Sequence, residues 1–343
     1  MNVADHWPSA ELETDLSCPC CGARASILLY EGLSDRVFGT APGVWTLRGC
    51  RDCGSAYLDP RPDEASIGRA YETYYTHEGD ASTWPSGARR QLLHAYLNDR
   101  WGYALESALP FGRVIEMLVP QRTAVTAREI RHLPSRPGGR LLDVGAGSGA
   151  FVAFARHLGW DAEGLDPDPS AAESAQARGV AVRHGTLADV AEGGCPFAAV
   201  TLSHVIEHLH DPLRELQRIR RLLAPDGRLW IATPNLDALG HRRYGRDWLG
   251  LDPPRHLILF TPASLRRLLG RAGFEVAHVP RAAPNAWQTF DQSRAIRAGR
   301  RPSFAGDIAK KFDLAKLADL IAFASPGLAE ELVIVAHPIA AAG

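Results

Sequence analysis

The stretch Leu141–Gly149, which reads LLDVGAGSG, decides the fold of this chain. An apolar run carries Asp143 near its end and leads into Gly145, Gly147 and Gly149, which are spaced one residue apart. Since glycine has no Cβ, the chain can turn sharply there and let a ligand lie against the backbone. A strand, a glycine turn and a following helix form the mouth of a nucleotide-type site in α/β folds. The stretch therefore predicts such a site at this turn.

Short apolar strands alternate with helical stretches after residue 137, which is typical of a parallel α/β sheet. Thr261 and Pro262 are a good helix start, with threonine as the N-cap and proline in the first turn. Helices are expected at Gly149–Leu158, Pro169–Arg178, Pro212–Leu223 and Thr261–Gly270. Strands are expected at residues 140–144, 160–165, 180–184, 198–203, 227–233, Phe274–Val279 and Glu331–Ala336. The predicted fold class is α/β, with a Rossmann-like seven-stranded sheet.

The composition divides the rest of the chain into further parts. Residues 1–60 carry five of the six cysteines, and residues 61–136 show helical periodicity. We expect a zinc ribbon at 1–60, a helical segment or cap at 61–136 and the α/β domain at 137–343. An insertion of loops and one or two helices is expected at 281–328, between the last two strands.

Two Cys-x-x-Cys pairs, each followed by glycine, lie in the first 60 residues. Two such turns can direct four thiolates to the corners of a tetrahedron, the geometry of a structural Zn²⁺ site. We predict Cys18, Cys21, Cys50 and Cys53 as the ligands, with Cys20 outside the set. Four protein ligands leave no open position, so the metal is expected to be structural. The alternative is a set of buried or redox-active cysteines.

The formal net charge of the 343-residue chain is -1, so its overall field indicates no polyanionic partner and makes nucleic acid an unlikely ligand. Arg242, Arg243 and Arg246 nevertheless form a local basic cluster. The chain shows no signal-peptide pattern and no apolar run near the roughly 20 residues that a spanning helix needs. We therefore expect a cytoplasmic protein that does not enter a membrane. The sequence does not indicate its oligomeric state.

Two carboxylates accompany the glycine turn. Asp143 could accept a hydrogen bond from a ligand ammonium, and Asp166, at the end of the next strand, could bind both hydroxyls of a ribose. The same arrangement serves dinucleotides, because Gly145, Gly147 and Ala150 satisfy the loose dinucleotide pattern. A nicotinamide-dependent oxidoreductase therefore stays open on these residues.

Three further blocks extend the pattern. Residues 197–209 read FAAVTLSHVIEHL, residues 222–235 read LLAPDGRLWIATPN, and residues 273–276 read GFEV. In this order and spacing the chain resembles the class I S-adenosylmethionine-dependent methyltransferases over about residues 137–280. That family usually has an aspartate where this chain has Ala198, a position that is normally structural.

The resemblance implies a set of cofactor contacts. Asp143, Gly145, Gly147 and Gly149 would hold the methionine part of S-adenosylmethionine, and Asp166 would hold its ribose. Further residues are implied along the rest of the cofactor: Leu187 near the adenine, and Ser203 and His204 near the sulfonium.

The paired cysteines joined to this core are similar to the sugar C-methyltransferases, although the chain is too short to hold their long C-terminal domain. In the related quinone O-methyltransferases, the loop equivalent to 204–208 carries acidic residues and a histidine, and His204 replaces the first acid here. The string His204-x-x-Glu207-His208 is also metalloprotease-like, but it follows a buried strand rather than lying within a helix. Glu207 and His208 could alternatively serve only to stiffen the loop.

Methyl transfer requires alignment of donor and acceptor and, for some acceptors, removal of a proton. Histidine suits that proton transfer near neutral pH. We take His208 as the first candidate base, His204 as the second and His256 as the third. Residues Tyr244–Leu257 are expected to line the acceptor pocket, because loops at the carboxyl ends of strands build it in this fold. Tyr71, Tyr74 and Tyr75 are candidates to cap the cofactor.

The function predicted from the sequence is methyl transfer from S-adenosylmethionine to oxygen or carbon of a small metabolite. A natural product, a sugar or a cell-envelope precursor is the expected acceptor. Two alternatives stay open: an NAD-dependent oxidoreductase, and a zinc-ribbon RNA- or protein-binding module that carries an inactive transferase domain.

Overall fold

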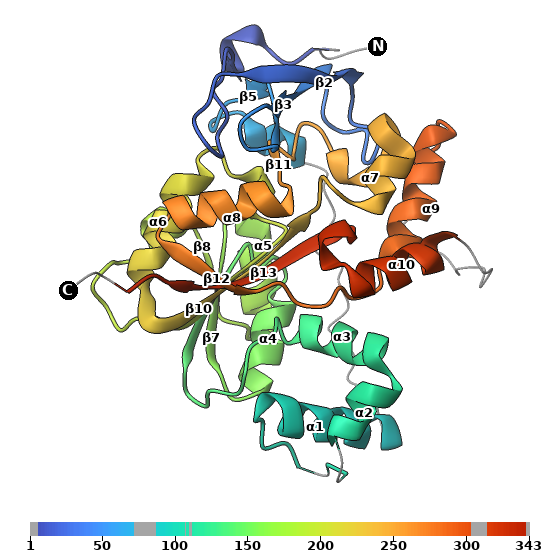
Figure 1. The fold of residues 1–343 in the computed structure, drawn as a ribbon. Coiled ribbons are helices and arrows are strands. Elements are labelled where there is room, and N and C mark those ends of the chain that lie inside the picture. The colour runs from blue at the N-terminus through green and yellow to red at the C-terminus, as the bar shows by residue number, and fades with distance from the viewer. Residues whose placement is uncertain (1–5, 72–86, 107, 110–111, 303–313, 341–343) are drawn as a thin grey trace.

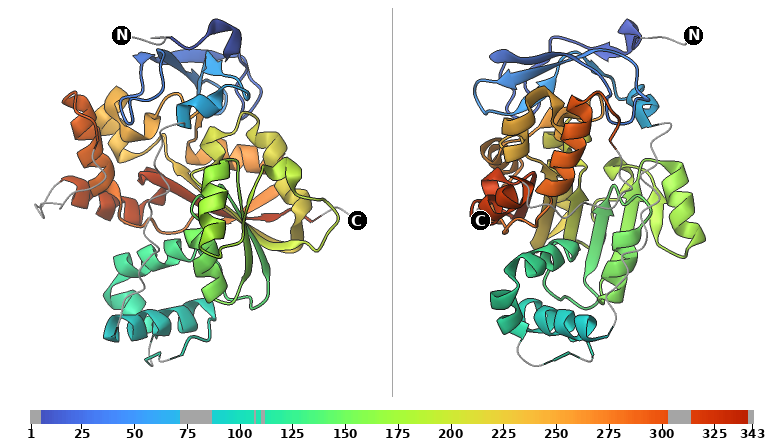
Figure 2. Two further views of the ribbon diagram at one scale, coloured as in Figure 1. Left: turned by 180° about the vertical axis from the view of Figure 1, so that it is seen from behind. Right: turned by 90° about the vertical axis from the view of Figure 1, so that its right-hand side faces the viewer.

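A computed structural model describes residues 6–71, 87–106, 108–109, 112–302 and 314–340 of the chain. A central sheet flanked by helices lies between a small N-terminal sheet at one end and a group of helices at the other (Figure 1). The view from behind and the side view in Figure 2 show the same arrangement. The central sheet carries the glycine turn, so it is the part that positions the predicted site.

The central sheet has seven strands in the order β12-β13-β10-β9-β6-β7-β8. Neighbouring strands from β10 to β8 are parallel, whereas β13 runs antiparallel to both β10 and β12. The Rossmann-like seven-stranded sheet predicted from the sequence is therefore confirmed. The strands are β6 (Arg140–Val144), β7 (Asp161–Asp166), β8 (Val182–His184), β9 (Phe197–Ser203), β10 (Leu223–Pro234), β12 (Phe274–His278) and β13 (Glu331–Pro338).

Strand β10 begins four residues earlier than the sequence predicts. Leu223 already pairs with Phe197 of β9, and the pairing register then shifts before Arg228. The Pro-Asp-Gly sequence at 225–227 lies within that irregularity and does not end the strand. A turn-forming tripeptide thus becomes a bulge, because the residues on both sides of it pair with the same neighbour.

Helices cover both faces of the sheet, because alternate strand residues point to opposite sides. Leu142 of β6 packs in one apolar cluster with Leu216 and Leu265, whereas its neighbour Leu141 packs in a second cluster with Val152. The helices of the first face are α6 (Pro212–Leu222) and α8 (Pro262–Arg271), and those of the second are α4 (Ala150–His157) and α5 (Pro169–Ala177).

Short polar side chains set the starts of these helices. Asp168 caps α5 and Asp211 caps α6 by accepting a backbone N–H bond, each with proline in the first turn. Thr261 caps α8 and exchanges hydrogen bonds with Ser264, so the helix start predicted there is confirmed.

The N-terminal sheet contains a strand from a distant part of the chain. Its order is β11-β4-β3-β2, and β11 (Ile258–Leu259) pairs with β4. The other strands of this sheet are β2 (Ser26–Leu33), β3 (Trp45–Cys50) and β4 (Ala56–Leu58), beside a small pair of β1 (Leu12–Glu13) and β5 (Arg61–Pro62). This sheet therefore combines strands from before residue 60 with β11 from residues 258–259. The division of the chain at residues 60 and 136 stays a prediction.

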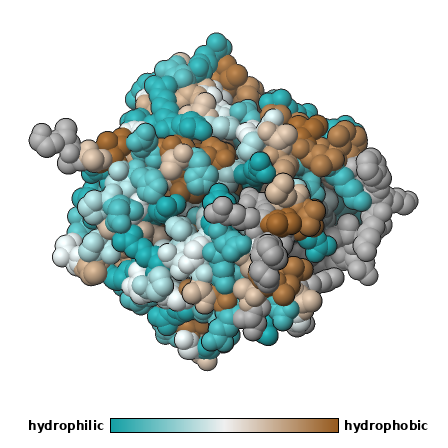
Figure 3. Space-filling model, turned by 60° about the horizontal axis from the view of Figure 1, so that its bottom comes forward, coloured by the Kyte–Doolittle hydropathy of each residue, from teal (hydrophilic) through white to brown (hydrophobic). Residues whose placement is uncertain are grey.

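The remaining helices lie outside the central sheet. Segment 88–129 holds α1 (Ala88–Trp101), α2 (Gly112–Leu118) and α3 (Pro120–Glu129). Helix α7 (Leu239–Tyr244) follows β10, and α9 (Ala286–Arg297) and α10 (Leu314–Ala324) lie between β12 and β13. Apolar side chains form several separate patches on the face seen in Figure 3. In the described part of the chain, no helix is long and apolar enough to cross a membrane.

Candidate functional site

The glycine turn adopts a backbone that only glycine takes without strain. Gly145, Gly147 and Gly149 have φ angles of 68°, 51° and 75°. A Cβ at Gly149 would lie 2.7 Å from a methyl group of Val180, and one at Gly145 would overlap Val205. The turn therefore brings the backbone close to its neighbours, as expected for a loop that cradles a ligand.

Asp166 lies directly beside this turn. It ends β7, which pairs with β6, and its Oδ2 accepts a hydrogen bond of 2.7 Å from Gly147 N. The other carboxylate oxygen accepts one of 2.9 Å from Asp168 N. These two bonds fix the carboxylate at the carboxyl edge of the sheet, where a nucleoside ligand binds in folds of this type.

Asp143 is buried beneath the turn and forms an ion pair with Arg131. Its Oδ1 also accepts a bond of 3.0 Å from Thr201, while its Oδ2 has no partner among the described residues. Burial raises the pKa of this carboxyl above its ordinary value. An unpaired buried acceptor is costly, so a donor such as an ammonium group or a water would be stabilised here. This orphaned oxygen and the glycine cradle fit the cofactor that the sequence implies.

The two other predicted cofactor contacts lie in different environments. Leu187 is buried in a short 3-10 helix, Leu187–Asp189, and packs in the main apolar cluster. Ser203 is half-buried at the carboxyl end of β9, next to His204. Both residues are near the carboxyl edge of the sheet, and their contacts with a cofactor stay predictions.

His204 forms contacts with two carboxylates. Its Nε2 lies 2.8 Å from Oε1 of Glu331, and its Nδ1 lies 3.3 Å from Oε1 of Glu207. Although desolvation alone would lower it, these carboxylates raise the pKa of His204 to about 9. The imidazole is thus protonated at neutral pH and has no free lone pair. Of the three candidate bases, His204 is the least suited to accept a proton.

The other two candidate bases, His208 and His256, lie beside each other with ring centroids 4.8 Å apart. Nδ1 of His208 is 2.8 Å from the carbonyl oxygen of Arg255, and Nδ1 of His256 is 2.8 Å from that of Gly250. A carbonyl oxygen only accepts, so each Nδ1 carries a proton, and in a neutral ring Nε2 then keeps its lone pair. Burial lowers the pKa of His208 to about 4, which leaves this ring neutral at pH 7.

Glu207 completes a group with these two histidines. Its Oε2 accepts a bond of 3.0 Å from Thr233, and its Oε1 lies 3.3 Å from Nδ1 of His204 in an ion pair. One ligand atom from each of Glu207, His208 and His256 lies within 4.8 Å of the others. Two imidazoles and a carboxylate, each oriented by a second hydrogen bond, could hold a divalent cation. Glu207 and His208 are adjacent in the sequence, whereas the proximity of both to His256 depends on the fold and was not predicted.

Tyr71 contacts the same histidine. Its hydroxyl lies 2.9 Å from Nδ1 of His208, so the residue following the N-terminal sheet reaches the loop after β9. Tyr74 and Tyr75, the other aromatic candidates, lie outside the described residues.

The four predicted metal-binding cysteines come together. Sγ of Cys18 is 3.7 Å from that of Cys53, Sγ of Cys21 is 3.5 Å from that of Cys50, and all four lie within 4.8 Å of one another. Zn–S bonds of about 2.3 Å in a tetrahedron place sulfurs roughly 3.8 Å apart, so this donor set fits Zn²⁺. Cys20 is not one of these four, and its Sγ contacts the carbonyl oxygen of Ser264 at 3.2 Å.

Charged residues that the sequence analysis did not select also meet at this edge. Glu331 forms an ion pair with Arg128 of α3 as well as with His204. Its neighbour Glu330 accepts a hydrogen bond of 2.9 Å from the indole of Trp248, and burial raises its pKa to about 7. In the sequence, the feature that could have indicated these residues is a pair of adjacent glutamates at the start of a buried strand. Their position at the edge follows from β13 running antiparallel to β10.

Comparisons with known proteins give matches to methyltransferases. Residues 120–279 match a family model described as a methyltransferase domain. The chain is 32% identical over 211 residues to the ubiquinone biosynthesis O-methyltransferase of Azorhizobium caulinodans, covering 58% of this chain and 78% of that protein. It is 33% identical over 182 residues to the protein of the same name from Ruegeria pomeroyi, covering 47% and 73%.

A solved structure is also similar. The S-adenosylmethionine dependent methyltransferase of Mesorhizobium loti aligns with a TM-score of 0.43 and 18% identity, covering 63% of this chain and 99% of that chain.

Proposed function

We propose a function from one premise: the chain belongs to the class I S-adenosylmethionine-dependent methyltransferases. Within that family we propose that it methylates an oxygen or carbon of a small metabolite, with a hydroxyl oxygen as the favoured acceptor. The observation that carries this choice is the neutral, half-buried His208, whose Nε2 keeps its lone pair at the edge of the sheet. The relatives at 32% and 33% identity carry names of O-methyltransferases, which supports the same choice.

The chain offers a contact for each part of the cofactor. Asp166 would bind the ribose, the glycine turn would hold the methionine part, and Asp143 would accept from the ammonium group. S-Adenosylmethionine, when bound, supplies a methyl group on a positively charged sulfur. The new bond joins this carbon to the acceptor oxygen, while the carbon–sulfur bond breaks and its electron pair stays on sulfur.

His208 would take the proton of the acceptor hydroxyl on Nε2 and release it later to solvent. Its Nδ1–H bond to the carbonyl oxygen of Arg255 fixes the ring in the tautomer that this step needs. The ring of His256 lies beside that of His208, with the two ring centroids 4.8 Å apart. His204, protonated between Glu207 and Glu331, would orient the loop and leave the proton transfer to His208.

Family membership favours methyl transfer over the two alternatives that the sequence left open. The family model and both relatives are methyltransferases, which removes the basis for an NAD-dependent oxidoreductase. An inactive transferase domain would be expected to lose its cofactor turn, whereas Gly145, Gly147 and Gly149 keep the geometry that a ligand needs.

Calorimetry with S-adenosylhomocysteine tests the cofactor assignment. We expect Asp166→Ala to lose measurable binding while the protein stays folded, because the ribose carboxylate is removed. Asp161→Ala is the matched control, since Asp161 is exposed at the opposite end of the same strand. Unchanged affinity in Asp166→Ala, or tight binding of NAD instead of S-adenosylhomocysteine, would contradict the proposal.

The acceptor atom needs a separate measurement. Incubation with methyl-labelled cofactor and a panel of phenolic, catecholic and sugar acceptors should give a methoxy product, identified by its carbon chemical shift. Label on carbon in every product would contradict the choice of oxygen.

A further inference from the structure

Three consecutive residues hold the loop that carries the proposed base. The carbonyl oxygen of Arg255 lies 2.8 Å from Nδ1 of His208, and the next residue is His256 itself. The backbone N–H of Leu257 donates a bond of 2.9 Å to the carbonyl oxygen of Glu207. The tautomer and orientation of the His208 ring therefore depend on segment 255–257, which begins 47 residues further along the chain.

Segment 255–257 runs directly into the N-terminal sheet. The carbonyl oxygen of Leu257 accepts a bond of 3.0 Å from the backbone N–H of Leu58. The next residue, Ile258, pairs with Tyr57 in the β11–β4 ladder. Strand β11 has two residues and β4 has three, and a pair of strands this short is marginally stable at best by itself. The position of β11 therefore depends on what holds β4 in place.

Strand β4 begins one residue after Ser55, a buried side chain that contacts the predicted zinc ligands. Its hydroxyl lies 3.1 Å from Sγ of Cys53 and 3.2 Å from Sγ of Cys18. Its carbonyl oxygen accepts a bond of 2.8 Å from the backbone N–H of Cys50. A hydroxyl can donate to a metal-bound thiolate, and such contacts outside the ligand set orient both groups. Zinc on the cysteines would thus fix the start of β4.

The N-terminal part of the chain also holds the other end of segment 255–257. The two carboxylate oxygens of Asp35, which follows β2, accept bonds of 2.7 and 3.1 Å from the guanidinium of Arg255. Both side chains are buried. His256 thus lies between Arg255 and Leu257, and each of these neighbours bonds to the N-terminal part.

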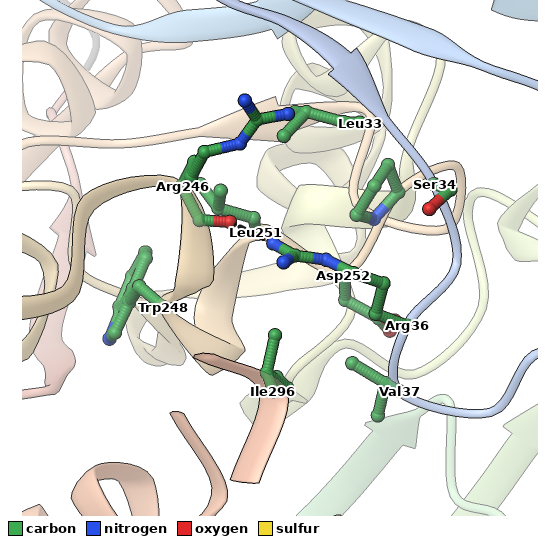
Figure 4. Close-up of a pocket in the computed structure, with 10 residues that line it drawn as sticks. Leu33, Ser34, Arg36, Val37, Arg246, Trp248, Leu251, Asp252 and Ile296 are labelled. Atoms are coloured by element: carbon green, nitrogen blue, oxygen red, sulfur yellow. Dashed lines mark hydrogen bonds between the residues drawn. The ribbon is translucent and has the colours of Figure 1, made fainter. Parts of the chain in front are cut away.

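The junction between these two parts has little free space. Leu33 and Val37 of the N-terminal segment, together with Trp248 and Leu251 of the loop before Arg255, line a cavity of about 10 Å³ (Figure 4). A cavity of that size has room for one water at most. Because close-packed surfaces transmit strain, a displacement of the N-terminal sheet would also move this loop.

We propose that the four-cysteine zinc site positions the proposed base through the N-terminal sheet. Zinc on Cys18, Cys21, Cys50 and Cys53 holds β4, β4 holds segment 255–257, and that segment fixes the ring of His208. The cysteines contact neither cofactor nor acceptor in this assignment, so they act as positioning residues. The assignment rests on the proposed function, since it names what holds the group that acts there as the base.

Hydrogen exchange and nitrogen NMR of the full chain, saturated with S-adenosylhomocysteine, test this assignment. The chain is compared with zinc bound, after chelation of the zinc, and after zinc is added back. Without zinc we expect faster exchange at the amides of Leu58 and Leu257, while the amides of β6 stay protected. The imidazole nitrogens of His208 should lose the separate signals of the single Nδ1–H form. Adding zinc back should restore both properties.

Two cysteine variants give the matched comparison. Cys53→Ser removes one of the four clustered thiols, whereas Cys195→Ser removes an exposed cysteine outside that set. We expect Cys53→Ser to show the zinc-free exchange pattern and methyl transfer slowed roughly 100-fold, the order of a general base's contribution. Its affinity for S-adenosylhomocysteine should match that of the native protein, because Asp166 and the glycine turn are held within the central sheet. Cys195→Ser should match the native protein in every measurement.

Two outcomes would overturn the positioning role. The first is a zinc-free protein in which the His208 signals and the exchange at Leu257 are unchanged. The second is loss of protection throughout β6, which would indicate that zinc stabilises the whole chain rather than this segment. Failure of the zinc-loaded protein to bind S-adenosylhomocysteine would instead count against the proposed function.

Discussion

Replacing Arg255 with methionine should strongly destabilise the protein, because this arginine joins two buried carboxylates. Its side chain has no exposed surface, and it donates to both oxygens of Asp35 and both oxygens of Asp252 over 2.6–3.1 Å. It also donates to the carbonyl oxygen of Ala70 at 3.1 Å. Asp35 follows β2 of the N-terminal sheet, whereas Arg255 lies shortly before β11. The contact therefore joins the N-terminal segment to a distant part of the chain.

The expected cost follows from what the substitution leaves behind. Methionine fills a similar volume but leaves the carboxylates of Asp35 and Asp252 buried without a cation. Removing one partner of a buried ion pair costs about 3–5 kcal/mol. That is a large part of the roughly 5–15 kcal/mol by which a domain is stable. Urea unfolding of the zinc-loaded protein measures this loss of stability: the variant should unfold at a lower urea midpoint, with an unchanged dependence of the unfolding free energy on urea concentration.

The pH dependence provides a second readout with a defined sign. Although burial alone would raise it, the Arg255 guanidinium holds the pKa of Asp35 well below its usual range. In the native protein this carboxyl therefore contributes stability above its unfolded pKa of about 3.9, and the contribution is lost as the pH falls. In Arg255→Met burial raises that pKa instead, so the variant loses stability as the pH rises. The difference between the two proteins should be largest near neutrality and shrink toward pH 4.

Two controls separate this reasoning from a general effect of the substitution. Arg221→Met removes an exposed ion pair and should change the free energy of unfolding by roughly 0.5 kcal/mol or less. Adding Asp35→Asn and Asp252→Asn to Arg255→Met should recover part of the loss, since no buried charge then remains. A cost below about 1 kcal/mol for Arg255→Met would refute the argument.

Four other measurements follow from the site. Purified protein should contain about one zinc per chain, and Cys53→Ser should lose it; a metal-free protein that stays fully folded would contradict the cysteine site. His208→Gln should slow turnover at near-normal affinity for S-adenosylhomocysteine, whereas full activity would leave this ring a structural role. His204 has a pKa raised to about 9, so its contribution to stability, taken as the difference from His204→Gln, should be complete below about pH 6.5 and disappear as the pH rises through 9. Burial raises the pKa of Glu330 to about 7, so Glu330→Gln should gain stability relative to the native protein between about pH 4.5 and 7, and a pH-independent difference would argue against that shift.

Local patterns along the chain predict most of the central sheet. The strand before Gly145, the capped helix at Thr261 and the paired cysteines each depend on residues a few positions apart, so a short stretch of sequence determines them. The strand predicted at 227–233 started too late, because the Pro-Asp-Gly sequence signals a turn and only pairing with β9 keeps the strand continuous. The glycine turn and Asp166 were likewise readable from their spacing alone.

The sequence by itself determined the α/β class, the glycine turn and the grouping of the four cysteines. Only the tertiary structure decided which distant groups meet. Glu331 reaches His204 across 127 positions, Asp35 reaches Arg255 across 220, and β11 joins the N-terminal sheet. Those contacts change the chemistry, because carboxylates hold the His204 imidazole protonated while burial keeps His208 neutral. Propensity and spacing act over a few residues, whereas charge state and shared sheets depend on which parts of the chain pack together.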